Sequence, residues 1–275
     1  MSRSTNVQPS RDDVQPGPED AQSGTRSAGG TVTIDASPDR VWQALTDARE
    51  LERWFPLDAR VEPGEDGRIW MSWRNEFAGD MKILVWEPPH HLRTSWSFGE
   101  GESPAQITDY VIETEGGSTV VRVVTSGFPL DSSWDGWVEG TNRGWAFELR
   151  SLKHYLERHD GESRHVVYLR RRVPLSPADA WARLAGSELG RWLDAGESFD
   201  RRPASQYAAI VSDPADAMFR VSIEPAAPGA NEPEIVMFMS EWGDQEQRLG
   251  EIGREWARQL EHVFPEGASP EDPNR

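Results

Sequence analysis

Tryptophan is the side chain best suited to forming a binding site in this sequence. The chain has 13 Trp among 275 residues, and nine of them lie between Trp42 and Trp145. Aromatic rings bind flat, mostly apolar molecules because they stack and bury a large area. Side chains alternate along a strand, so residues two apart share a face. Three such pairs are Met71 with Trp73, Thr94 with Trp96, and Tyr110 with Ile112.

These pairs have two interpretations. If their faces point toward the helix that is predicted to end this region, they line an aromatic pocket. Otherwise the rings fill an ordinary hydrophobic core. The residues assigned to the pocket lining are Trp54, Met71, Trp73, Trp96, Tyr110 and Trp145.

The histidines form no recognisable metal or proton-transfer site in the sequence. Adjacent residues in a strand or turn point apart, so His90 and His91 are expected in a solvent-exposed turn. His154 and His159 are five residues apart on a predicted helix, a spacing that does not place two side chains on one face. No metal ligand is therefore assigned, and no cofactor is expected.

The carboxylates also lack a catalytic arrangement. Asp109 and Glu113 lie four residues apart on the strand face opposite Tyr110, without a histidine paired to them in the sequence. We expect that face to be solvated. The glycine turns have no helix behind them to bind phosphate, and no serine nucleophile motif occurs. No catalytic residue is assigned.

The composition excludes several classes of function. Net charge of -18 disfavours nucleic acid and anionic membranes as partners, and zero Cys excludes disulfides, Cys-ligated zinc and thiol nucleophiles. The apolar runs are too short to span a bilayer, and residues 2–30 contain no signal-like apolar segment, so a cytoplasmic location is expected. The basic run 170–172 is interpreted as the charged face of an edge strand.

A repeated pattern divides the chain. Ser37-Pro38 opens a helix with a capping serine and a proline at its first position, and Ser176-Pro177 does the same farther along. Trp145-x-x-x-Leu149 likewise recurs as Trp256-x-x-x-Leu260. The offset is 139 positions at the caps but 111 at the tryptophans, so the second copy lacks 28 residues, roughly one hairpin.

Hydrophobic periodicity predicts an α+β fold for each copy. In the first, a strand at 31–36 and two short helices precede a helix with one apolar side that ends at Arg158. Strands between them are predicted at 60–62, 68–74, 81–86, 92–98, 106–114 and 119–126. In the second copy, strands are predicted at 165–173, 207–212, 218–224 and 234–242, before a helix at 245–264. Each antiparallel sheet should curl around its last helix.

The predicted organisation has four parts. Residues 1–30 are polar and are expected to be a disordered tail. A complete domain covers 31–160, a shortened and degenerate copy covers 164–265, and 266–275 form a second disordered tail.

Several segments, in order, carry a resemblance to a known family. They are Ser37-Pro38 with Val41 and Trp42, Glu65-Asp66-Gly67-Arg68, the run 85–96, Gly116-Gly117-Ser118, Thr125-Ser126-Gly127-Phe128, and Gly144-Trp145. Together they resemble the family related to the C-terminal domain of the heat-shock protein 90 ATPase activator, within the START-like (SRPBCC) superfamily. The resemblance covers about 31–159. It implies a helix-grip fold with a cavity that relatives use for apolar small molecules, and it transfers no fixed catalytic set.

Three functions follow as alternatives. The first is a non-catalytic protein that binds a small apolar or aromatic ligand in the first domain. The second, from the family's name, is a chaperone-regulating or other protein-interaction module. The third is a cyclase-like or dehydratase-like enzyme, which would need polar groups inside the cavity. The partner is thus expected to be an apolar small molecule or a protein.

Overall fold

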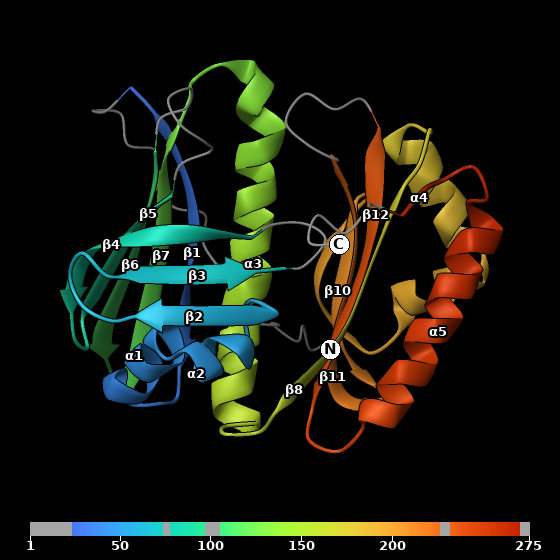
Figure 1. The fold of residues 1–275 in the computed structure, drawn as a ribbon. Coiled ribbons are helices and arrows are strands. Elements are labelled where there is room, and N and C mark those ends of the chain that lie inside the picture. The colour runs from blue at the N-terminus through green and yellow to red at the C-terminus, as the bar shows by residue number, and fades with distance from the viewer. Residues whose placement is uncertain (1–23, 74–77, 97–104, 226–231, 270–275) are drawn as a thin grey trace, which may run out of the picture.

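Two antiparallel sheets with one long helix between them form the architecture of this protein (Figure 1). The structure is a computed structural model that describes residues 24–73, 78–96, 105–225 and 232–269. The first unit runs to the end of α3 (Asp135–Arg158), and the second follows it. The α+β helix-grip architecture predicted from the sequence is confirmed.

The first unit has a sheet of seven strands in the order β1-β7-β6-β5-β4-β3-β2. Two short helices, α1 (Pro38–Thr46) and α2 (Ala48–Glu52), follow the first strand, and a 3-10 turn, η1 (Ser132–Trp134), precedes α3. The strands are β1 (Arg26–Ile34), β2 (Asp58–Glu62), β3 (Arg68–Ser72), β4 (Ala78–Glu87), β5 (His91–Trp96), β6 (Gln106–Glu115) and β7 (Ser118–Phe128). The predicted strand ends at 74 and at 97–98 lie outside the described residues.

The second unit repeats this order with two strands fewer. Its sheet order is β8-β12-β11-β10-β9, so in both units the first strand pairs with the last. The elements are β8 (Arg164–Arg172), α4 (Pro177–Ala185), the 3-10 helix η2 (Glu188–Asp194), β9 (Glu197–Arg202), β10 (Gln206–Ser212), β11 (Ala215–Pro225), β12 (Pro233–Trp242) and α5 (Glu246–Val263). The predicted loss of one hairpin is confirmed.

The Ser-Pro caps form as the sequence predicts. The Ser37 hydroxyl accepts the Arg40 backbone N–H at 3.2 Å, and the Ser176 hydroxyl accepts the Asp179 N–H at 3.1 Å. Each cap satisfies one N–H that has no partner within its helix. The equivalent cap geometry fixes where both helices begin.

Strand β1 begins earlier than the predicted domain start at residue 31. It needs Gly29, because a Cβ there would lie 2.0 Å from the Val123 carbonyl oxygen. The Gly29 N–H donates to the Asn142 side-chain oxygen at 2.9 Å, which ties the strand to α3. At the other end, Ala268 pairs with Arg172 through both backbone hydrogen bonds. Order therefore extends into both predicted tails, whose remaining residues lie outside the described ranges.

Helix α3 buries two faces, so the prediction of one apolar side is wrong. Trp145, Leu149 and Leu152 belong to the core beneath the first sheet. Phe147 lies on the opposite side of the helix, where its ring centroid is 5.6 Å from that of Phe238 in β12. The second sheet therefore packs on the face of α3 that the sequence pattern left to solvent.

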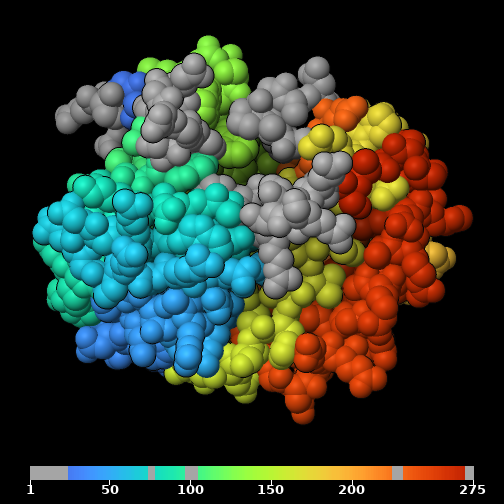
Figure 2. Space-filling view, viewed as in Figure 1, coloured from blue at the N-terminus to red at the C-terminus, as the bar shows by residue number. Residues whose placement is uncertain are grey.

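The second sheet lies between two helices. Trp256 and Leu260 of α5 pack against the sheet face that points away from α3. In Figure 1, α3 stands between the sheets and α5 covers the far side of the second. Figure 2 shows the yellow-green residues after α3 lying between the blue and cyan first unit and the red second unit. Within the described residues, no helix is both long and apolar enough to cross a membrane.

Candidate functional site

The aromatic residues predicted to line a pocket come together beneath the first sheet. Trp54, Met71, Tyr110 and Trp145 are buried, and Trp73 is half-buried against the same core. Trp96 is half-buried at the end of β5. The predicted strand faces are confirmed by register, because Leu92 pairs with Tyr110 and Thr94 with Thr108 on adjacent strands.

Phe55 is the centre of this cluster, and sequence reasoning missed it. Its ring stacks on Trp54 at 4.9 Å and meets Trp73 edge-on at 5.0 Å. It also lies 5.4 Å from Trp145, whose ring contacts Tyr110 edge-on at 5.7 Å. The available signal was its position directly after Trp54, where a turn brings neighbouring rings to the same side. We call Trp54, Phe55, Trp73, Tyr110 and Trp145 the aromatic cluster.

A short polar chain anchors one edge of the aromatic cluster. The Trp145 indole N–H donates to the Thr125 hydroxyl at 3.0 Å, and that hydroxyl lies 3.0 Å from the Thr108 hydroxyl. These bonds fix the ring of Trp145 against strands β6 and β7. The indole is thus held in one orientation by hydrogen bonding as well as by packing.

The Tyr110 hydroxyl differs from the other polar groups near the aromatic cluster. The residue is 5% exposed, and burial alone raises the pKa of its phenol. The hydroxyl makes no hydrogen bond with the described residues, but its oxygen is not one of their fully enclosed atoms without a partner. An oxygen in this position can bond water or one polar atom of a bound molecule.

A cavity lies in the second unit. It has a volume of about 250 Å³ and opens between η2 and α5. Its lining is Arg191, Trp192, Arg248, Glu251, Ile252, Glu255, Trp256 and Arg258, and it includes none of the six predicted pocket residues. The cavity is therefore separate from the aromatic cluster.

The predicted solvated face of the first sheet is confirmed, but its charges are paired. Arg93 forms two hydrogen bonds with Asp109, at 2.7 and 3.1 Å. His91 Nε2 also lies 2.7 Å from an Asp109 oxygen. The expectation that His91 lies in a solvent-exposed turn is therefore wrong. His91 is the first residue of β5, where strand pairing aims its ring along the sheet toward β6. Glu113 lies 4.0 Å from Arg122 on the same face.

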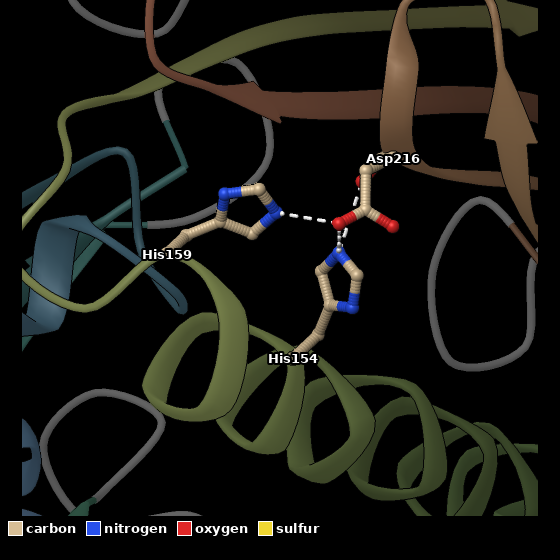
Figure 3. Close-up of side chains that lie close together, drawn as sticks. All are labelled: His154, His159 and Asp216. Atoms are coloured by element: carbon tan, nitrogen blue, oxygen red, sulfur yellow. Dashed lines mark hydrogen bonds and ion pairs between the residues drawn. The ribbon is translucent and has the colours of Figure 1, made fainter.

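His154 and His159 lie side by side, contrary to the helical-spacing argument (Figure 3). Their ring centroids are 5.0 Å apart. His159 is the C-cap of α3, with φ -132° and ψ 24°, so it has left the helix and its side chain turns back over the last turn. Asp216, the second residue of β11, meets both rings. A spacing rule for intact helices could not have found this group.

The His154, His159 and Asp216 cluster joins the two units. His159 Nε2 is 3.1 Å from Asp216 Oδ2, and His154 Nε2 is 2.9 Å from the Asp216 backbone oxygen. The ring of Trp242 in β12 stacks on His159 at 5.0 Å, while its indole N–H donates to the Arg53 carbonyl of the first unit at 2.8 Å. The end of α3 is thus held against the second sheet.

Comparisons with known proteins identify the fold of the first unit. Residues 35–157 match the family described as Activator of Hsp90 ATPase homolog 1-like protein. No curated protein matches the chain.

Solved structures similar to the chain include CalU16 from Micromonospora echinospora, with 22% identity, TM-score 0.43, and coverage of 53% of this chain and 86% of that one. The Aha1 dimer from Colwellia psychrerythraea has 24% identity and TM-score 0.43, covering 49% and 98%. DynU16, a protein in the dynemicin biosynthetic locus, has 16% identity and TM-score 0.42, covering 87% and 96%.

Proposed function

Because residues 35–157 belong to the START-like family related to the activator of the heat-shock protein 90 ATPase, we propose that the first unit binds a small, mostly apolar or aromatic molecule. The site lies between the first sheet and α3, at the aromatic cluster. Its walls are the six residues singled out in the sequence, together with Phe55. Rings held at fixed angles suit a flat ligand, because stacking needs no further ordering of the side chains.

The Tyr110 hydroxyl is the observation that carries this proposal. Apolar pockets fix the orientation of a ligand through a few polar groups. Tyr110 offers one such group, because its hydroxyl makes no hydrogen bond with the described residues and its oxygen is not one of their fully enclosed unpaired atoms. The ligand that fits is therefore mostly apolar and has one hydrogen-bonding atom.

The other two functions lack a comparable observation. An interaction module should expose a contiguous apolar patch, but among the described residues Leu130, 63% exposed, is the large hydrophobic residue on the surface. An enzyme should bring at least two ionisable groups together inside the cavity. In the described part of the aromatic cluster, Tyr110 is the ionisable side chain.

Replacing the hydroxyl tests the proposal. In Tyr110→Phe, we expect the free energy of unfolding without ligand to stay within about 0.5 kcal/mol of the wild type, because no hydrogen bond to the described residues is lost. Ligand affinity should fall by about 3- to 10-fold, the worth of one hydrogen bond. Native mass spectrometry of the purified chain measures the retained molecule, and urea unfolding measures stability.

Tyr207→Phe is the matched control. Tyr207 is also a buried tyrosine, but its hydroxyl donates to the Ala195 carbonyl at 2.8 Å in the second unit. Its loss should reduce stability by roughly 1 kcal/mol and leave ligand retention unchanged. A wild-type chain that retains no small molecule, and whose Trp emission does not respond to an apolar probe, would count against the proposal. So would a loss of stability in Tyr110→Phe as large as that in the control.

A further inference from the structure

The cluster at the end of α3 gathers ligand atoms that suit a metal ion. His154, His159 and Asp216 each offer one atom, and the three atoms lie within 4.8 Å of one another. Figure 3 shows both imidazole rings pointing at the Asp216 carboxylate. Two imidazoles and one carboxylate are a ligand set typical of catalytic and accessory Zn²⁺ sites, which leave a fourth position for water.

Two carboxylates face the two ring nitrogens of His159. Its Nδ1 lies 2.9 Å from Glu162 Oε2, and its Nε2 lies 3.1 Å from Asp216 Oδ2. A neutral imidazole has one N–H, so it can donate to one of these carboxylates but not to both. The other nitrogen would then direct its lone pair at a negative oxygen. A metal ion between Nε2 and Asp216 removes this repulsion, and the charge of Arg158 beside Asp216 reduces it.

Glu162 supports the metal alternative. A histidine that binds a metal through one nitrogen usually donates its other N–H to a carboxylate or carbonyl, which fixes the tautomer and the ring orientation. The contact between His159 Nδ1 and Glu162 supplies that bond. The stacked ring of Trp242 holds the same imidazole from its face. His159 is therefore oriented by two neighbours, with Nε2 directed at Asp216.

We propose that His154 Nε2, His159 Nε2 and the Asp216 carboxylate bind a divalent transition metal ion, with Zn²⁺ the best fit. Bonds of about 2.0–2.1 Å in a tetrahedral site place ligand atoms roughly 3.3 Å apart. The two Nε2 atoms now lie 3.9 Å and 3.1 Å from Asp216 Oδ2, so small side-chain movements complete the site. His154 exchanges its bond to the Asp216 carbonyl for the metal, and its ring proton moves to Nδ1.

The environment of His154 agrees with a metal ligand. The side chain is buried, and its Nε2 is directed at Asp216. Asp216 has φ 61°, a left-handed conformation that is uncommon for residues other than glycine. Backbone strain of this kind persists where surrounding contacts hold it, often at binding sites. The metal would clamp the end of α3 to the hairpin of the second unit.

Arg158 opposes the metal. Its Nε donates to Asp216 Oδ2 at 2.6 Å, so its positive charge competes for the same oxygen. The guanidinium is 60% exposed and can move into solvent when a cation binds. This competition predicts that removing the Arg158 charge strengthens metal binding, a result that a purely structural ion-pair cluster would not give.

Metal titration of the full chain tests the proposal. After treatment with a chelator, the chain should bind about one equivalent of Zn²⁺ at about pH 7.5, where histidine is mostly neutral, as measured by isothermal titration calorimetry. His159→Gln and Asp216→Asn should each weaken binding at least about tenfold. Glu162→Gln removes the carboxylate that orients His159 and should weaken binding by no more than roughly 10- to 100-fold. Arg158→Gln should tighten it. Bound Zn²⁺ should also raise the melting temperature, because it binds the folded state.

His262→Gln is the matched control, since His262 is an exposed histidine in the last turn of α5, away from the cluster. It should leave the affinity unchanged. The proposal is overturned if the chain binds no stoichiometric Zn²⁺, or if binding is insensitive to both His159→Gln and Asp216→Asn. In either case the group is an ion-pair cluster in which Arg158 supplies the positive charge beside Asp216.

Discussion

The two units differ most in what covers the outer face of each sheet. In the first unit, that face carries Asp109, Arg93 and Glu113, with solvent beyond them. In the second, α3 covers the corresponding face and α5 covers the other, so every residue of β12 is buried. One pattern of strands therefore produces an open sheet in one half of the molecule and a fully enclosed sheet in the other.

The ion pairs of the enclosed sheet are less exposed to solvent than those of the open sheet. Glu234 in β12 is 1% exposed and forms ion pairs with Arg170 and, at 3.1 Å, with Arg172. Asp109 of the first unit is 19% exposed, and its partner Arg93 is 43% exposed. Both are pairs between adjacent strands. Solvent screens the pair of Asp109 and Arg93 in the first unit. Glu234 in the second unit is removed from water, so its charge is stabilised by its arginine partners alone.

The largest expected effect concerns the equivalent tryptophans of the two terminal helices. Trp256→Ala removes a ring that is completely buried between α5 and the second sheet, so unfolding should become easier by about 3–5 kcal/mol. Trp145→Ala should cost about 3 kcal/mol, the lower end of this range, because Trp145 is 8% exposed and the proposed ligand site beside it reduces the packing lost. Urea unfolding of both variants measures the difference. A Trp145 loss within measurement error would remove it from the core and from the pocket.

The ion pairs give the next largest effect. Glu234→Gln removes the carboxylate that is paired with the buried Arg170, which should cost about 3 kcal/mol even though Glu224 also acts on that arginine. Asp109→Asn breaks a pair on the open face and should cost no more than about 1 kcal/mol. Equal losses in the two variants would contradict the difference in covering that separates the two sheets. The free energy of unfolding of each variant at neutral pH is the measurement.

A smaller effect is expected at Glu241, which is fully buried in β12 opposite His165. Burial raises the pKa of its carboxyl above the usual value. A carboxyl with a raised folded-state pKa is most favourable to folding below its unfolded pKa, and that contribution is lost as the pH rises through the folded pKa. Glu241→Gln should therefore gain about 1 kcal/mol near neutral pH, by removing a buried charge.

The gain from Glu241→Gln should disappear toward about pH 4, where the carboxyl is protonated in both states. Urea unfolding at both pH values, compared with the wild type, isolates this contribution. A variant that is less stable than the wild type near neutral pH would show that the ionised carboxylate is needed in the enclosed sheet.

Local pattern predicted most of the fold. The strand at 106–114 is observed as Gln106–Glu115, and the long helix as Asp135–Arg158, because period and capping are local properties of the sequence. Strand β9 (Glu197–Arg202) was missed, since its mostly polar residues show no strand alternation. The second face of α3 was missed because the sheet that covers it comes later in the chain.

In the candidate sites, too, the sequence predicted what depends on local pattern and missed what depends on contacts between distant segments. Alternation correctly placed Met71, Trp73 and Tyr110 on the inner face of the first sheet. The cluster of His154, His159 and Asp216 could not be predicted, because His159 has left the helix and Asp216 is 57 residues farther along. The basic run 170–172 lies on an edge strand, as predicted, but Arg170 is enclosed with Glu234 rather than exposed.

The most direct test of the central claim, that the first unit keeps room for a ligand, is a titration with an apolar fluorescent probe followed by tryptophan emission. The variants are Trp145→Phe and Trp256→Phe, which keep an aromatic ring at the equivalent position in each unit. We predict that the wild type and Trp256→Phe respond to the probe, and that Trp145→Phe loses most of the response. A response that survives in Trp145→Phe but disappears in Trp256→Phe would contradict this and move the ligand to the second unit.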